Sequence, residues 1–191
     1  MTSRQTATIY VGDVLAVRVA TEIKTVVGSC IAVCLIDQRA RVAGMNHFML
    51  PASTKNGRDA QDRARFGVHA MDLLIGAMLK AGADRRAMVA KVFGGAHVLL
   101  VPESATSIPQ SNIRFIDEFM AAEGIPVMSR DVGGYLPRRL HLHTDSGKVY
   151  VHRLGQHALQ EARLQERQHL RVMRRTGGPG GDVTLFNGAG G

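Results

Sequence analysis

The sequence predicts a single domain rich in β-strands, with two amphipathic helices between them. The chain has 191 residues, the usual length of one domain, with 45% hydrophobic and 21% charged residues. Short apolar runs with a period of two recur before residue 50 and again after residue 137. Two intervening segments instead carry apolar residues at helical spacing. No apolar run approaches the ~18–20 residues that a membrane-spanning helix needs.

The chain begins with strand-like segments. Two apolar pieces between Thr6 and Arg18, broken at Gly12, predict a leading strand or hairpin. Alternating apolar residues then extend over 19–27. Gly28 and Ser29 follow, and their small side chains let the backbone bend tightly or approach a ligand.

The most informative stretch is a predicted β-hairpin, formed by the apolar runs Val26–Asp37 and Val42–Pro51. If the connection is symmetric about Gln38–Arg39, Cys30 lies directly opposite His47 in the ladder. Directly opposed side chains have Cβ atoms about 4.5–5.5 Å apart, which is close enough for a thiol–imidazole contact. A three-residue connection would shift the register by one and remove that opposition.

The rest of the chain alternates helices and strands. Its predicted elements are a loop over 52–65, a helix from Val68 to Leu79 that ends at Gly82, a buried strand over 87–93, a helix from Ser111 as N-cap to Gly124 as stop, a strand over 126–130, a turn over 131–134, and a hairpin pairing 138–143 with 148–153. Gly94 and Gly95 follow the buried strand without a nucleotide-binding glycine motif, so close backbone packing is the preferred explanation.

The pair Cys30 and His47 is open to three interpretations. Spacing alone favours the first, in which Cys30 is a small core hydrophobe. A zinc site would need further ligands, and Cys34 is too far along an extended strand to share one metal with Cys30. In the third interpretation Cys30 is a nucleophile and His47 its base, with a nearby group such as the Thr25 hydroxyl or a main-chain carbonyl orienting the imidazole.

The formal net charge of +8 is concentrated late in the chain, where residues 153–175 hold six arginines and two glutamates. Base-stacking residues are few and no zinc-finger spacing occurs, so we expect no nucleic-acid partner and treat the charge as electrostatic steering. Residues 1–155 are expected to form the domain, 156–175 a basic helical extension and 176–191 a glycine-rich disordered tail. The N-terminus lacks a signal-peptide core and the two cysteines form no disulfide framework, which predicts a cytoplasmic protein with reduced thiols.

Several ordered motifs resemble the chemoreceptor glutamine deamidase (CheD) family. The most specific blocks are Gly28-Ser29-Cys30 and Asn46-His47-Phe48-Met49-Leu50-Pro51. The likeness extends over about residues 11–154 and continues in Lys91–Ala96, in Asn112, in Asp131–Gly134 and in Arg138. Pro109 departs from the family pattern, where a glycine is more usual.

This resemblance implies an α+β fold in one domain, with stacked, sandwich-like β-sheets and helices packed on the outside. It also implies hydrolysis of glutamine side chains to glutamate on the cytoplasmic helices of methyl-accepting chemotaxis receptors, and family members are credited with methyl-ester hydrolysis too. Cys30 would be the nucleophile, His47 the general base and acid, and Thr25 the third residue, with backbone amides at Gly28 and Ser29 holding the oxyanion.

The resemblance further implies that no metal or organic cofactor is needed, and that a CheC-type phosphatase is a possible partner. Two alternatives are a non-catalytic module that binds a receptor or such a phosphatase, and a cysteine peptidase. The peptidase is disfavoured because no Asp or Asn is placed to orient the imidazole: the side chain of Asn46 should point to the face opposite His47.

Overall fold

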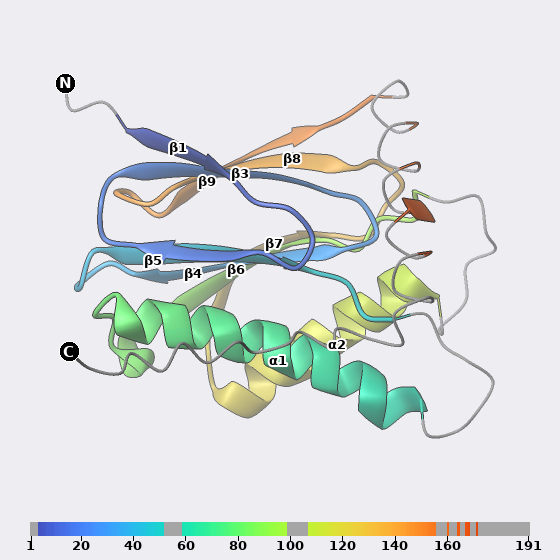
Figure 1. The fold of residues 1–191 in the computed structure, drawn as a ribbon, viewed down its shortest axis with the longest axis horizontal. Coiled ribbons are helices and arrows are strands. Elements are labelled where there is room, and N and C mark those ends of the chain that lie inside the picture. Colours follow the sequence, from blue (N-terminus) through green and yellow to red (C-terminus); the bar gives the residue numbers. More distant parts are fainter. Residues whose placement is uncertain are drawn as a thin grey trace, which may run out of the picture.

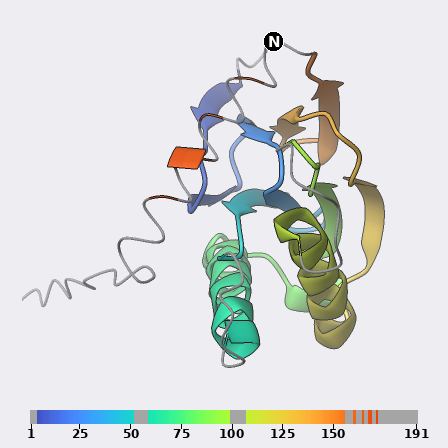
Figure 2. The ribbon, with the colours of Figure 1, turned by 90° about the vertical axis from the view of Figure 1, so that its right-hand side faces the viewer.

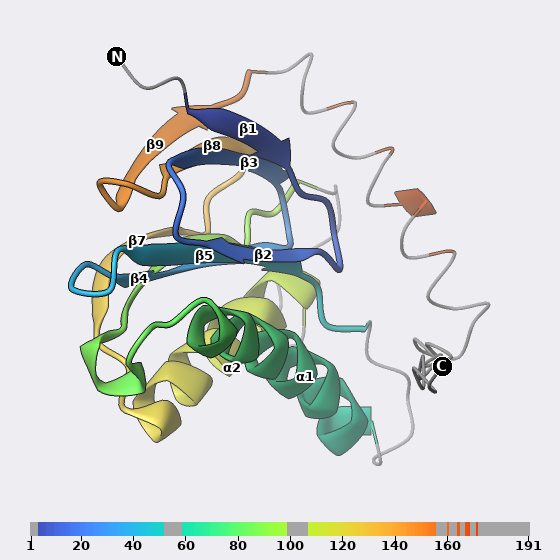
Figure 3. The ribbon, with the colours of Figure 1, turned by 60° about the vertical axis from the view of Figure 1, so that its left-hand side comes forward.

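In the computed structural model the molecule has three layers, a four-stranded sheet, a five-stranded sheet and a pair of helices (Figure 1). The structure describes residues 4–51, 59–98 and 107–155, with isolated further positions between 160 and 171. The two sheets stack face to face, and both helices cover the outer face of the five-stranded sheet (Figure 3). The predicted α+β class with stacked sheets and external helices is therefore confirmed.

The four-stranded sheet is the outer layer, and its strand order is β1-β3-β8-β9. Its strands are β1 (Gln5–Thr8), β3 (Thr21–Val27), β8 (Arg138–His143) and β9 (Lys148–Arg153). In β3, buried residues alternate strictly with half-buried ones, because one face of the strand lies against the second sheet and the other faces outward. The hairpin β8–β9 has the predicted bounds.

The five-stranded sheet is the central layer, and its strand order is β2-β5-β4-β6-β7. Its strands are β2 (Val14–Val17), β4 (Ile31–Asp37), β5 (Val42–Phe48), β6 (Val89–Gly94) and β7 (Val127–Val132). Every residue of β4 and β5 is buried, since these strands are covered on both faces.

The helices α1 (Asp59–Lys80) and α2 (Ile108–Glu123) lie next to each other against the central sheet (Figure 2). A short 3₁₀ helix, Arg85–Ala87, leads into β6. Gly124 ends α2 in the left-handed conformation (φ +65°), as the sequence predicts. Among the described residues, no helix is long and apolar enough to cross a membrane.

Of the two alternatives predicted before Arg18, the leading strand is confirmed and the hairpin is excluded, because β1 pairs with β3 in one sheet and β2 pairs with β5 in the other. Two predicted helix boundaries are wrong. Helix α1 begins within the predicted loop, since its first turns lack the apolar periodicity that would reveal them. Helix α2 starts after Ser107 instead of Ser111, because Pro109 is tolerated in the first turn of a helix.

The predicted opposition of Cys30 and His47 is also wrong. In the β4–β5 ladder His47 pairs with Ala32, so the register differs by two residues from the prediction. The connection contains residues 38–41 instead of two residues. The Asp37 carboxylate accepts the Ala40 N–H (3.0 Å) and Arg41 adopts a left-handed φ of 55°. A shift of two preserves the face, so His47 lies on the side of β4 that carries Ala32 and Cys34, and Cys30 belongs to the same core between the sheets.

Two apolar cores fill the spaces between the layers. One lies between the central sheet and the helices, and the other lies between the sheets and contains Cys30 and Cys34. The expected extension over 156–175 and the tail over 176–191 lie outside the described residues apart from isolated helical positions.

Candidate functional site

The candidate site lies where the chain crosses from one sheet to the other. The predicted apolar run 26–37 is not one strand: β3 ends at Val27, residues 28–30 bend, and β4 begins at Ile31 in the second sheet. The Gly28-Ser29-Cys30 motif is this crossing. It therefore places Cys30 at the end of the interlayer core, next to residues from both sheets.

Hydrogen bonds to three successive carbonyl oxygens hold the crossing in place. The Gly28 oxygen accepts the Ala96 N–H (2.7 Å) and the Cys30 oxygen accepts the Gly95 N–H (2.8 Å). Between them, the Ser29 oxygen accepts the side-chain Nδ2–H of Asn112 (2.7 Å). Because each peptide group is planar, these bonds fix the orientation of the backbone around the thiol.

Gly94 is required for this close packing. Its φ is +113°, and a Cβ atom there would lie 2.1 Å from the carbonyl oxygen of Cys30. Only glycine accommodates both the backbone conformation and the approach. The predicted explanation of Gly94 and Gly95 as close backbone packing is confirmed, and the partner of that packing is the cysteine segment.

His47 is held by both sheets. Its backbone N–H donates to the Asp13 carbonyl (3.2 Å) and its carbonyl accepts the Gly12 N–H (2.7 Å). Its ring Nδ1 lies 2.9 Å from Oγ1 of Thr25, which projects from β3 across the space between the sheets. The sequence-predicted Thr25 and His47 are thus brought together.

The hydrogen bonds of Thr25 determine which nitrogen of His47 carries a proton. The Thr25 hydroxyl donates its single proton to the carbonyl oxygen of Ile9 (2.9 Å). Its oxygen then accepts from the imidazole, so Nδ1 is the protonated nitrogen. Neutral His47 accordingly has Nε2 as its basic nitrogen, and this is the tautomer a general base at Nε2 requires.

Cys30 and His47 face the same interlayer space. Cys30 immediately precedes β4, two residues before Ala32, the ladder partner of His47, and belongs with Ala32 and Cys34 to the core between the sheets. Cys30, His47 and Thr25 are only 2%, 5% and 3% exposed, so the three polar groups lie in a low-dielectric environment. The arrangement can support nucleophilic chemistry by a thiol with an adjacent, oriented base.

Cys34 lies on the same side of the sheet but has different surroundings. It is fully buried in the middle of β4, and this burial raises the pKa of its thiol to about 12. Neither Cys30 nor Cys34 forms a disulfide. Within the described residues, no group of three or more His, Cys, Asp and Glu side chains is arranged to hold a metal ion.

Asn46 points away from the site, as predicted. Its side chain donates to the Ala70 carbonyl of α1 (3.0 Å) and accepts the Val33 N–H (3.2 Å). Asn112 was identified in the sequence only as part of a motif, and its contact with the cysteine segment was missed. The available signal was a polar residue one turn before Ile116, on the apolar face of α2.

A loop after β7 lies beside the cysteine segment. The Gly133 N–H donates to the carbonyl oxygen of Gly94 (2.9 Å), and the Gly134 carbonyl accepts the His97 N–H (2.7 Å). Buried Arg138 fixes this loop by donating to the Gly133 carbonyl (2.7 Å) and to Asp131 (2.8 Å). Burial alone would raise the pKa of Asp131, but its hydrogen bond and ion pair with Arg138 hold that pKa below the usual value.

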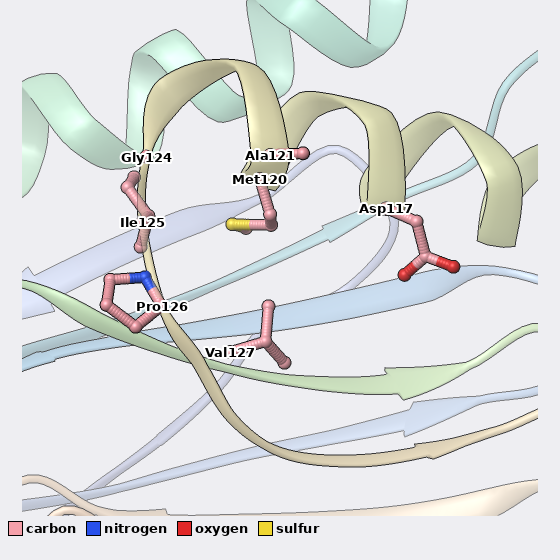
Figure 4. A pocket seen from close by; sticks show the side chains of 7 residues that line it. All are labelled: Asp117, Met120, Ala121, Gly124, Ile125, Pro126 and Val127. Carbon is pink, nitrogen blue, oxygen red and sulfur yellow. The ribbon is translucent and has the colours of Figure 1, made fainter.

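A shallow groove of about 340 Å³ lies between the end of α2 and the start of β7 (Figure 4). Its lining includes Met120, Gly124 and Val127. Gly124 is twelve residues beyond Asn112, which is about 18 Å along a helix. The groove is therefore remote from Cys30 and adds nothing to the site.

Comparisons with known proteins agree on one family. A family model described as CheD chemotactic sensory transduction matches residues 49–153, a span that begins just after His47. A probable chemoreceptor glutamine deamidase CheD of Laribacter hongkongensis is 42% identical over 153 residues, 78% of this chain and 74% of the relative. A probable chemoreceptor glutamine deamidase CheD 1 of a Ruegeria species is 39% identical over 191 residues, 95% of each chain.

Proposed function

Because the chain belongs to the CheD family, we propose that it hydrolyses specific glutamine side chains of chemotaxis receptors to glutamate, with Cys30 as the nucleophile. The observation that carries this proposal is the 2.9 Å contact between Thr25 Oγ1 and His47 Nδ1, with Cys30 in the core between the same two sheets, two residues before the ladder partner of His47. A core-packing role for Cys30 gives no reason for an oriented, buried imidazole next to it.

In the proposed reaction the Cys30 thiolate attacks the carboxamide carbon of the glutamine, and His47 holds the proton taken from the thiol. The tetrahedral intermediate collapses as the C–N bond breaks and His47 protonates the departing ammonia. A thioester between Cys30 and the substrate remains. His47 then removes a proton from water, which attacks the thioester, and the products are glutamate and the free thiol.

The negative charge on the intermediate needs nearby donors, which we assign to backbone N–H groups of the segment Gly28–Cys30. Support for this assignment comes from the fixed carbonyl groups of that segment, since they hold the peptide planes in one orientation. Preorganised donors of this kind cost no rearrangement during the reaction.

We assign catalysis to the domain 1–155 and propose that its substrates are the acid-rich signalling helices of chemoreceptors. The net charge of +8 supports this proposal, because opposite charge speeds the encounter. The basic segment 156–175 contributes to this field. A CheC-type phosphatase is the proposed regulatory partner.

The test is incubation of the whole protein with the cytoplasmic fragment of a receptor from the same organism, followed by peptide mass spectrometry. Conversion of defined glutamines to glutamate, abolished in His47→Ala, is the expected result. If the wild-type protein binds receptor fragments but converts no glutamine in any of them, the chain is a binding module and the proposal is wrong.

A further inference from the structure

We propose that Asn112 is a positioning residue that holds the nucleophile segment and the base segment in register. This inference rests on the proposed function. The side chain of Asn112 is fully buried in the first turns of α2 and has one donor and one acceptor directed at different parts of the site. None of its atoms needs to touch the substrate for this role.

Asn112 connects two segments that no strand pairing joins at this point. Its Nδ2–H donates to the carbonyl of Ser29, the residue before the nucleophile (2.7 Å). Its Oδ1 accepts the backbone N–H of Leu50, three residues after the base and beyond the end of β5 (2.8 Å). One planar amide therefore sets the distance between the segment that leads into β4 and the segment that follows β5.

The bond to Ser29 also fixes the direction of a candidate oxyanion donor. The Ser29 carbonyl and the Cys30 N–H belong to the same trans peptide group and point in opposite directions. Holding the carbonyl towards Asn112 consequently directs the Cys30 N–H away from α2. Loss of the Asn112 donor frees this peptide to rotate, which displaces both the N–H and the thiol.

Two substitutions separate the two contacts. Asn112→Asp retains an acceptor for Leu50 and, when its carboxyl is ionised, has no proton for the Ser29 carbonyl. Asn112→Ala removes both contacts without adding a charge. We expect kcat for deamidation to fall on the order of 10²-fold in Asn112→Asp and by at least as much in Asn112→Ala. KM should change little, because Asn112 is fully buried and does not touch the substrate in the proposed role.

Asp37→Ala is the matched control. Asp37 is also a buried polar residue, and its carboxylate accepts the Ala40 N–H (3.0 Å) and the Asp84 N–H (2.8 Å). It is seven residues from Cys30, about 23 Å along an extended strand. Its substitution should lower the melting temperature as the Asn112 variants do but leave kcat near the wild-type value.

The pH profile of Cys30 alkylation distinguishes failure of this inference from failure of the proposed function, because it needs no substrate. In the wild type the profile should have its midpoint below the ~8.5 of a free thiol. In folded Asn112→Ala, which adds no charge beside the thiol, it should move towards that value. A wild-type profile at the free-thiol value contradicts the proposed thiol–imidazole pair. A low wild-type midpoint that is unchanged in both Asn112 variants, with kcat also unchanged, contradicts the role of Asn112 alone.

Discussion

Cys30 and Cys34 lie four residues apart in the same core between the sheets, and their places in the fold differ. Cys34 is in the middle of β4, where it is paired with Met45 of β5 and Lys91 of β6. Cys30 immediately precedes β4, at the bend where the chain leaves one sheet for the other. Cys34 is thus enclosed within a strand, whereas Cys30 lies at the crossing where we propose the reactive site.

The difference follows from the topology. In the middle of a buried strand the backbone bonds are all committed to the ladder, and only neighbouring side chains contact the thiol. At the crossing, the Asn112 side chain of α2 bonds to the Ser29 carbonyl, and Thr25 of β3 and His47 of β5 bond to each other between the two sheets. Reactive chemistry is therefore expected at the crossing and not within the strand.

Removal of each thiol should give the largest contrast. We expect Cys30→Ala to reduce receptor deamidation by more than about 10³-fold, because no other group replaces the nucleophile. Cys34→Ala should keep near-wild-type activity and lose only some stability, as a small buried truncation does. Mass spectrometry of receptor peptides measures both. Activity that survives in Cys30→Ala would remove the distinction between the two cysteines.

The hydroxyl of Thr25 should be the next most important group. Thr25→Val preserves the shape but cannot accept the Nδ1–H of His47, so kcat/KM should fall by about 10²-fold. Thr25→Ser retains the hydroxyl and should recover most of the activity. Steady-state kinetics of both variants provides the comparison, and equal losses in the two would mean that packing, not the hydrogen bond, is what Thr25 contributes.

The two thiols should also differ in reactivity without substrate. Burial raises the pKa of Cys34 to about 12, so at pH 7 its thiol stays protonated. Iodoacetamide at neutral pH should modify Cys30 alone, and Cys34 should react only when the protein is unfolded. Peptide mapping after timed alkylation checks this, and equal rates at the two sites in the folded protein would contradict it.

The smallest effect is expected at the far end of β4. Burial would raise the pKa of Asp37, but hydrogen bonds from the backbone N–H groups of Ala40 and Asp84 lower it below the usual value. A lowered carboxyl pKa adds stability that is present above the unfolded-state pKa of ~3.9 and lost as the pH falls through the folded-state value. Asp37→Asn should therefore unfold about 1–2 kcal/mol more easily at pH 7.

The difference in unfolding free energy between the wild type and Asp37→Asn should become smaller in acid. Denaturant unfolding at pH 7 and below pH 4 measures this difference. Asp37→Asn should leave deamidation unchanged, since Asp37 lies at the other end of the strand. A deficit that is constant over this pH range would mean that the charge of Asp37 does not contribute.

Much of the fold could be predicted from local patterns. The alternation in β3, the stop at Gly124 and the bounds of β8 and β9 depend on neighbouring residues only. The register of the β4–β5 hairpin could not be predicted in this way. The Asp37 carboxylate and the left-handed Arg41 belong to a connection that is two residues longer than the predicted one. The change of sheet at residues 28–30 was also hidden, since β3 and β4 form one continuous apolar run in the sequence.

For the site, the sequence indicated the residues but not the contacts between them. Cys30 and His47 could be selected from the sequence by their residue types. The predicted register was wrong by two residues, and an even shift leaves His47 on the predicted face of the sheet. The contact between Thr25 and His47 joins two sheets, and the contacts of Asn112 come from a helix more than 60 residues further along the chain. Such contacts depend on tertiary packing, which no local pattern encodes.

The most direct test of the central claim is rapid acid quenching of the reaction between the protein and a receptor fragment, followed by peptide mapping. The account predicts a transient adduct in which the glutamyl side chain of the receptor is joined as a thioester to the peptide that contains Cys30. An adduct on Cys34, or full glutamine conversion by Cys30→Ala with no adduct on any cysteine, would contradict it.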